Sequence, residues 1–390
     1  MTVIRRSIRH CALIATILLC AFDLSARGGD AVVENVVLIT LDGLRGEELF
    51  GGADQRLMTP ENGVKTPDQL KSKFWKETRT ERRELLMPFL WKMSLSKSGW
   101  IAGDIEADSQ VAVSNGMFFS YPGYNEILTG KPDPAVDSND KKYNANVTVL
   151  EWLHGKEAFR GKVAAYTSWD VFPFIINDKR SGIPVNSGWQ KFEVGEANRV
   201  ATLNLVSEQL FHEWDGVRYD VLTTAGAIEE LTTRAPRVLF VGLGETDDWA
   251  HAGRYDRYLL AAQQNDRFIE LLWETCQKLP SHRDKTLFII TTDHGRGIDR
   301  EGWKNHGTSH PGSERIWVAA FGPGVRQGGI DTEGKFVPGK FVQGKFVQGK
   351  FVQGKFVQAQ VAATVAAALG EDFTTSSPGI HPSLPFLEAD

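Results

Sequence analysis

The sequence predicts an α/β fold with a mostly parallel central sheet and helices on both faces. Apolar, β-rich runs alternate along the chain with segments of helical periodicity. These runs are hydrophobic over nearly their whole length, as strands buried on both faces are. With 390 residues, 42% of them hydrophobic, the chain can bury a large core. The predicted strands are 35–41, 162–168, 237–243, 286–292 and 316–322.

The N-terminus has the pattern of an export signal. Three arginines precede the apolar stretch CALIATILLCAF, and LSA before Arg27 offers small residues for cleavage. The apolar stretch is too short to span a bilayer comfortably. We therefore predict a signal peptide at 1–26, a single domain at 31–390, and an exported protein, periplasmic or secreted, with no integral membrane span in the mature chain.

Charge argues against a nucleic-acid scaffold role, and cysteine content against an intrachain disulfide. The net charge is -5 and no run of lysine or arginine occurs, so we expect no nucleic-acid scaffold role. Cys276 is the only cysteine beyond the predicted signal, so the mature chain can form no intrachain disulfide. It lies in a helical pattern and is predicted to be a small core residue. The sequence makes no prediction of oligomeric state.

Two segments are predicted to lie outside the regular α/β alternation. Residues 50–114 form a cap-type insertion, in which 78–93 has helical spacing that suits either a cap helix or an ordinary surface helix. Residues 335–358 repeat the unit KFVQG, whose period of five matches neither helix nor strand. We predict an expanded hairpin or loop near the sheet edge there, followed by a helix over 359–370.

Carboxylates and imidazoles follow three of the predicted strands. Asp42 comes directly after the first, Asp247 and His251 after the third, and Asp293 and His294 after the fourth. In open α/β sheets the carboxyl ends of the strands form the ligand-binding edge, so these side chains are expected to converge. Asp247 and His251 are four residues apart, which places them on the same face of a helical turn, where they can hold one cation.

Two further histidines, His306 and His310, precede the last predicted strand. Together with the residues above they form a set of neutral imidazoles and carboxylates without thiolate. Such a set suits Zn²⁺ or Mn²⁺. The sequence therefore predicts a metal site at the carboxyl edge of the sheet.

The stretch FFSYPGYNEILTG, residues 118–130, contains a candidate nucleophile. It begins as an apolar strand, is predicted to turn on Pro122 and Gly123, and continues as a short helix that ends at Gly130. A strand that leads into a sharp turn presents Ser120 at the sheet edge, where several hydrolases keep the residue that attacks substrate. The alternative is a serine that caps the following helix.

The order of these parts resembles that of the alkaline phosphatase superfamily, from about Asn35 to Pro323. The segment SYPGYNEILTG is especially similar to the nucleophile segment of its nucleotide pyrophosphatase/phosphodiesterase branch. The resemblance implies an alkaline-phosphatase-like three-layer sandwich and a two-metal hydrolase. It also implies that Ser120 attacks phosphorus and forms a phosphoserine intermediate that water releases.

The resemblance further implies a ligand set for two divalent ions, with Zn²⁺ favoured and Mn²⁺ as the alternative. A late histidine completes one of the two sites. His310 is preferred for this role, because HPG ahead of a strand that ends in Gly-Pro looks like the phosphatase pattern, and His306 is the alternative. One ion is then held by Asp247, His251 and His310, and the other by Asp42, Asp293, His294 and the Ser120 oxygen.

The predicted function is hydrolysis of small-molecule phosphate esters, with phosphodiesters or pyrophosphates favoured over monoesters. A sulfatase of this superfamily would carry an arginine where Tyr124 stands, which disfavours that activity. Two alternatives are kept open. One is a sulfatase-like or phosphonate hydrolase of the same superfamily, and the other is a non-catalytic binding member of the fold.

Overall fold

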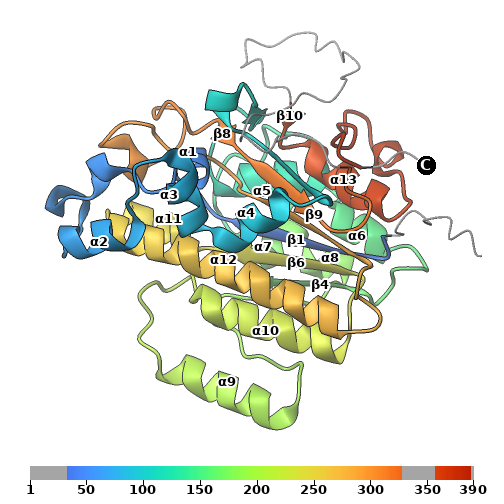
Figure 1. Cartoon of the computed structure of the whole chain (residues 1–390). Coiled ribbons are helices and arrows are strands. Elements are labelled where there is room, and N and C mark those ends of the chain that lie inside the picture. Colours follow the sequence, from blue (N-terminus) through green and yellow to red (C-terminus); the bar gives the residue numbers. More distant parts are fainter. Residues whose placement is uncertain (1–32, 327–355, 388–390) are drawn as a thin grey trace, which may run out of the picture. The chain divides into compact units, whose positions relative to one another are not determined.

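A seven-stranded sheet forms the centre of the computed structural model, which describes residues 33–326 and 356–387 (Figure 1). Its strand order is β2-β9-β7-β1-β6-β4-β5. All neighbours from β7 to β5 pair in parallel, whereas β9 runs antiparallel to both β7 and β2. The strands are β1 Asn35–Leu41, β2 Gly99–Ala102, β4 Val163–Thr167, β5 Val185–Ser187, β6 Val238–Leu243, β7 Thr286–Thr291 and β9 Val318–Phe321.

A second sheet of three short strands has the order β10-β3-β8. These strands are β3 Val111–Ala112, β8 Arg315–Ile316 and β10 Phe356–Val357. The predicted strand 316–322 is therefore divided between the two sheets at Trp317. The carbonyl of Trp317 accepts a hydrogen bond from Thr291 Oγ1 at 2.6 Å, and its indole donates to the Leu44 carbonyl at 2.8 Å. The other four predicted strands are confirmed to within a residue at either end.

Helices cover both faces of the central sheet. Alternate residues of β1 face opposite cores: Val37 and Ile39 pack with α1 to α4 and α10 to α12, while Val36 and Leu38 pack with α5 to α7 and α13. Figure 1 shows the long helix α12 lying beside α10. The predicted three-layer α/β arrangement is thus confirmed.

The α-helices are α1 Gly46–Gly51, α2 Pro67–Phe74, α3 Arg79–Leu86, α4 Pro88–Ser94, α5 Ser120–Thr129, α6 Val149–His154, α7 Phe172–Ile176, α8 Asp178–Ser181, α9 Ala197–Gln209, α10 Asp220–Thr233, α11 Glu245–His251, α12 Tyr255–Lys278 and α13 Gln360–Ala368. The short 3-10 helices are η1 Gln55–Leu57, η2 Pro60–Asn62, η3 Ile105–Ala107, η4 Gly302–Lys304 and η5 Phe373–Thr375.

The segment 78–93 is two helices rather than the one predicted. Helix α3 ends at Leu86 and α4 begins at Pro88, because proline disfavours helical backbone at the preceding residue and lacks the N–H that would continue the helix. Leu86, Phe89 and Leu90 are buried, and α4 contacts both α12 and β9.

Parts of the sequence-based predictions fall outside the described residues. The predicted signal peptide at 1–26 does so entirely, and so do residues 335–355 of the repeat. All described residues belong to one compact unit within Ala31–Asp390. The last unit of the repeat supplies β10, and the helix predicted after it is α13. Within 33–326 and 356–387, no helix is both long enough and apolar enough to cross a membrane.

Asp266 on α12 allows a test of how α4 is held against the core. Its buried carboxylate accepts hydrogen bonds from the backbone N–H groups of Phe89, at 2.9 Å, and Leu90, at 2.7 Å, in the first turn of α4. Asp266→Ala leaves these donors unpaired in the interior, so the free energy of unfolding should fall by about 2 kcal/mol.

Urea unfolding measures this change. Glu274→Ala, at a half-exposed position of the same helix, is the matched control and should shift the unfolding free energy by less than about 0.5 kcal/mol. Equal effects of the two substitutions would contradict the capping role.

Candidate metal centre

The three central strands deliver the predicted ligands to one edge of the sheet. In the order β7-β1-β6, the first ends just before Asp293 and His294, the second ends just before Asp42, and the third leads into α11 with Asp247. His251 is the last residue of α11, and its Nε2 lies 3.3 Å from Asp247 Oδ2. The convergence expected from the strand ends is therefore present in the fold.

Asp42, Asp293 and His294 form a first group of potential ligands, and all three are buried. His294 Nε2 lies 3.4 Å from Asp42 Oδ1 and 3.4 Å from Asp293 Oδ2. Within the described part of the chain, neither of these buried carboxylate oxygens accepts a hydrogen bond. The other ring nitrogen of His294, Nδ1, lies 2.9 Å from the Gly295 carbonyl, to which it can only donate, so Nε2 keeps a free lone pair.

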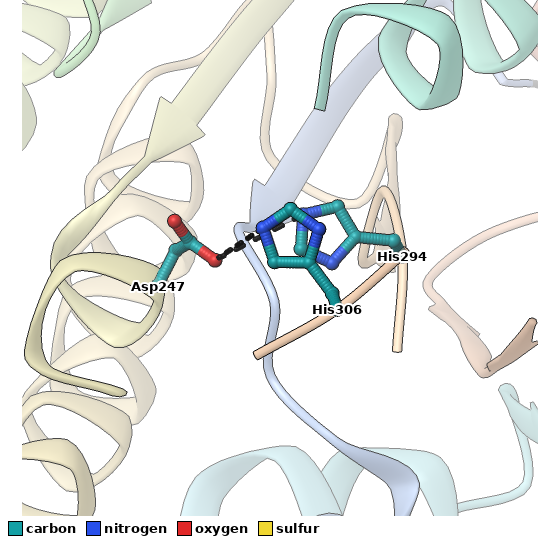
Figure 2. Close-up of side chains that lie close together, drawn as sticks. All are labelled: Asp247, His294 and His306. Atoms are coloured by element: carbon teal, nitrogen blue, oxygen red, sulfur yellow. Dashed lines mark ion pairs between the residues drawn. The ribbon is translucent and has the colours of Figure 1, made fainter. Parts of the chain in front are cut away.

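Asp247, His294 and His306 form a second group (Figure 2). The His294 and His306 rings stack with centroids 3.8 Å apart, and Asp247 faces both of them. Asp247 Oδ1 lies 3.9 Å from His294 Nε2 and 3.7 Å from His306 Nε2. His306 Nε2 is also 3.0 Å from His251 Nε2, so His251 borders the same group.

The structure brings His306, and not His310, into this centre. His306 Nδ1 donates to the Phe118 carbonyl at 3.2 Å, which leaves its Nε2 directed at the acidic side of the site. His310 belongs to neither group. Its imidazole instead contributes to lowering the pKa of Asp299, which is held down chiefly by the backbone N–H groups of Gly302 and Glu301.

Ser120 is the first residue of α5, and its surroundings differ from both sequence-based interpretations. The residues directly before it, 113–119, are not in a strand. Pro122 and Gly123 lie in the first helical turn, where proline loses no hydrogen bond. The capping position is Phe119, so Ser120 is not the cap. Its Oγ lies 3.4 Å from His294 Nε2, and the helix ends at Gly130 as predicted.

Burial and mutual repulsion set the protonation of the carboxylates. Burial raises the pKa of Asp42 well above its usual range, and the neighbouring Asp293 and Asp247 raise it further. Burial, with repulsion from Asp247, raises the pKa of Asp293 to about 8. Burial would raise the pKa of Asp247 as well, but the charges of Arg296 and the surrounding histidines outweigh it and hold that pKa low.

Sequence reasoning missed three residues that shape the centre. Tyr124, one helical turn after Ser120, donates from its hydroxyl to Asp42 Oδ2 at 2.9 Å. Arg296, two residues after His294, donates to Asp247 Oδ1 and to the Trp303 carbonyl. Gly43 has φ +58° and donates to Asp293 Oδ1, and a Cβ there would come within 2.5 Å of Arg296. The i, i+4 spacing of Ser120 and Tyr124 was the available signal for the first.

A buried glutamate organises the loop that precedes Ser120. Glu126 on α5 accepts hydrogen bonds from the backbone N–H groups of Ser114 and Asn115, both at 3.0 Å. Asn115 Oδ1 in turn accepts from the Phe118 N–H at 3.0 Å, and Phe118 has the left-handed φ of 58°. Because the Phe118 carbonyl holds His306, this loop connects helix α5 to a potential ligand.

A small pocket of about 220 Å³ opens onto the centre. Ser120 lies in its wall, although only 6% of the residue is exposed. The pocket residues are Asp42, Ser120, Asn139, Trp169, Val217, Gly244, Asp247, Asp248, His251 and His306. Among these described residues there is no lysine or arginine.

A family model of known proteins matches the part of the chain that contains most of this centre. Residues 217–371 match the family model of the Metalloenzyme superfamily. The match includes β6, β7 and every histidine of the two groups. This match to a family of metalloenzymes agrees with the resemblance that the sequence predicts.

Several solved structures are similar to this chain at low identity. The zinc complex of the C-terminal periplasmic domain of EptC from Escherichia coli is 11% identical with a TM-score of 0.49, covering 93% of this chain and 90% of that one. A protein of the alkaline phosphatase superfamily from Vibrio parahaemolyticus is 13% identical with a TM-score of 0.48, covering 87% and 67%. The lipoteichoic acid synthase LtaP from Listeria monocytogenes is 11% identical with a TM-score of 0.46, covering 90% and 74%.

The donor set of the centre fits a divalent metal ion. Two buried carboxylate oxygens without hydrogen bonds and an imidazole lone pair meet at short range, and no basic side chain compensates the first group as Arg296 compensates Asp247 among the described residues. Buried charges of one sign are unfavourable unless a cation or a proton balances them. Carboxylate and imidazole are ligands that Zn²⁺ and Mn²⁺ accept.

Replacement of the two late histidines tests which of them is a ligand. His306→Ala should lower zinc affinity by more than about 100-fold, because the loss of a ligand costs more than the loss of an outer hydrogen-bond partner. His310→Ala is the matched control and should bind zinc as the unaltered protein does. Competition with a chromophoric chelator measures both affinities, and the reverse ranking would restore His310 as the ligand.

The pH dependence of stability tests the buried Glu126. Burial raises its pKa from the ordinary value of 4.5 to about 7, so the protonated form is favoured in the folded state. Its contribution to stability is complete below pH 4.5 and is lost as the pH rises through 7. Relative to Glu126→Gln, the unfolding free energy of the unaltered protein should therefore fall over this range, by on the order of 3 kcal/mol. Parallel stability curves from urea unfolding at several pH values would show that Glu126 titrates normally.

Proposed function

We propose that this chain is an exported, two-metal hydrolase of phosphate esters in which Ser120 is the nucleophile. The observation that carries the proposal is the position of Ser120 Oγ, 3.4 Å from His294 Nε2, at the point where the two ligand groups meet. Asp42, Asp293 and His294 would hold one ion, and Asp247, His251 and His306 the other. The Ser120 oxygen would complete the first site, so this set differs from the one implied by the resemblance only in that His306 replaces His310.

The chain's own residues prepare the displacement at phosphorus. When bound, the two ions supply positive charge that favours the ionised serine and offsets charge on the transferring phosphoryl group. Ser120 Oγ loses its proton to solvent and forms a bond to phosphorus as the bond to the leaving oxygen breaks, and the leaving oxygen takes a proton from solvent. Water then attacks the phosphoserine, and Ser120 Oγ leaves and regains a proton. Tyr124 and Gly43 hold Asp42 and Asp293 in place throughout.

The pocket favours a substrate of low negative charge. Its wall contains Trp169 and Val217 as apolar surface, with Asp248 beside them. Since the described pocket residues include no lysine or arginine, a second phosphate group would find no cationic side chain there. A phosphodiester, with one negative charge, therefore suits the pocket better than a pyrophosphate or a monoester.

Two alternative functions, a sulfatase and a non-catalytic binding protein, have less support in the site. The position where a sulfatase carries arginine is Tyr124, whose hydroxyl is bonded to Asp42. A non-catalytic binding member would have no need for a serine hydroxyl beside the two ligand groups. Sulfate and phosphonate substrates separate a sulfatase-like or phosphonate hydrolase from a phosphodiesterase.

The decisive assay uses residues 27–390, loaded with Zn²⁺ or Mn²⁺, and aryl phosphodiester, phosphomonoester, phosphonate and sulfate substrates. The diester should be hydrolysed fastest, activity should disappear with a chelator, and Ser120→Ala should lose at least roughly 10³-fold in kcat while keeping its zinc. Full activity in Ser120→Ala, or turnover that is insensitive to chelator, would contradict the mechanism. Metal-loaded protein without turnover of any substrate would favour the binding member.

A further inference from the structure

The last unit of the KFVQG repeat is built into the core beneath the metal centre. Phe356 is 3% exposed, and its ring packs edge-on against Trp100 with centroids 5.6 Å apart. Phe356 and Val357 form β10, which pairs in parallel with β3. The backbone N–H of Gln358 extends this pairing by donating to the Ala112 carbonyl at 2.9 Å. These contacts fix the position of the Gln358 side chain.

The Gln358 side chain ties down the turn that carries two potential ligands. The residue is fully buried, and its Nε2 donates to the Thr292 carbonyl at 3.0 Å and the Asp293 carbonyl at 2.6 Å. Strand β7 ends at Thr291, so these carbonyls lie just beyond its regular pairing. Gln358 satisfies both at the point where the chain turns to direct Asp293 and His294 into the centre.

The same segment also reaches the helix of the nucleophile. The backbone N–H of Ala359, the next residue, bonds to the Glu126 carboxylate on α5. Helix α5 itself packs closely on the ligand turn, since a Cβ on Gly123 would come within 2.4 Å of the Asp293 carbonyl oxygen. Gln358 and Ala359 therefore connect α5, which begins at Ser120, to the turn of Asp293 and His294.

We propose that Gln358 is a positioning residue for the metal centre, holding Asp293 and His294 in the orientation that binds the ion. The inference rests on the metal site of the proposed function. It gives the final repeat unit a role that its period of five does not suggest. Hydrogen-bond partners behind metal ligands typically contribute 10–100-fold to metal affinity. Gln358 is such a partner, because its side chain bonds to the backbone carbonyl of Asp293.

The test is zinc affinity of the full chain carrying Gln358→Met, which keeps the length of the side chain and removes both donors. Competition with a chromophoric chelator, at a temperature well below the unfolding midpoint, should show an affinity lower by about 10–100-fold. The repeat offers a matched control: Gln353 has the same place in the preceding unit, and Gln353→Met should keep the unaltered affinity. Equal affinities for the two variants would overturn the proposal.

Further readings separate the ways in which the test can fail. An unaltered protein that binds no zinc contradicts the proposed function itself, whereas one that binds zinc as tightly as Gln358→Met overturns only the positioning role. A purely structural role would lower the thermal midpoint of the metal-free protein without changing the zinc affinity of the folded protein. If Gln358→Met does not fold, Gln358→Asn, which keeps the amide on a shorter stem, is measured in the same way, and an undiminished affinity there overturns the proposal.

Discussion

The repulsion between buried carboxylates at the end of the sheet is the constraint on which the site depends. Asp42 and Asp293 face one imidazole nitrogen from the ends of two neighbouring strands, and one oxygen of each has no hydrogen-bond partner among the described residues. Such an arrangement is unfavourable in the interior unless a cation or a proton balances it. Arg296 balances Asp247 alone. The edge of the sheet is therefore arranged for positive charge that the side chains of the described residues do not supply.

The rest of the architecture holds these groups at short range. Parallel pairing of β7, β1 and β6 brings their ends together, which no single segment could do by itself. Close packing follows from small residues: Gly43 leaves room for Arg296, and Gly123 lets α5 approach the Asp293 backbone. Behind them, Glu126 and Gln358 bond to backbone groups of the loops that lead to the site. Rigidity of this kind suits a centre whose ligands have little freedom to rearrange.

The site is acidic, because carboxylates, rather than lysine or arginine side chains, line its pocket among the described residues. Tyr124 uses its hydroxyl to orient Asp42, at the position where a sulfatase of the resembling superfamily carries arginine. The pocket beside Ser120 combines the aromatic surface of Trp169 with the carboxylate of Asp248. Recognition of substrate would therefore depend on bound cations and on apolar contact. This combination is the basis of our proposal that the substrate is a singly charged phosphate ester.

The sequence by itself determined the elements whose signals are local. Continuous apolar runs identified the central strands, and residues placed directly after them, such as Asp42 and His294, were recognisable because parallel strands share one carboxyl edge. Tertiary structure alone showed that His306, and not His310, lies beside Asp247 and His294, with its ring bonded to the Phe118 carbonyl. It also decided that Gln358, one of several identical repeat positions, lies behind Asp293. The sequence pattern predicts neither position, because each depends on contacts between segments that are distant in the chain.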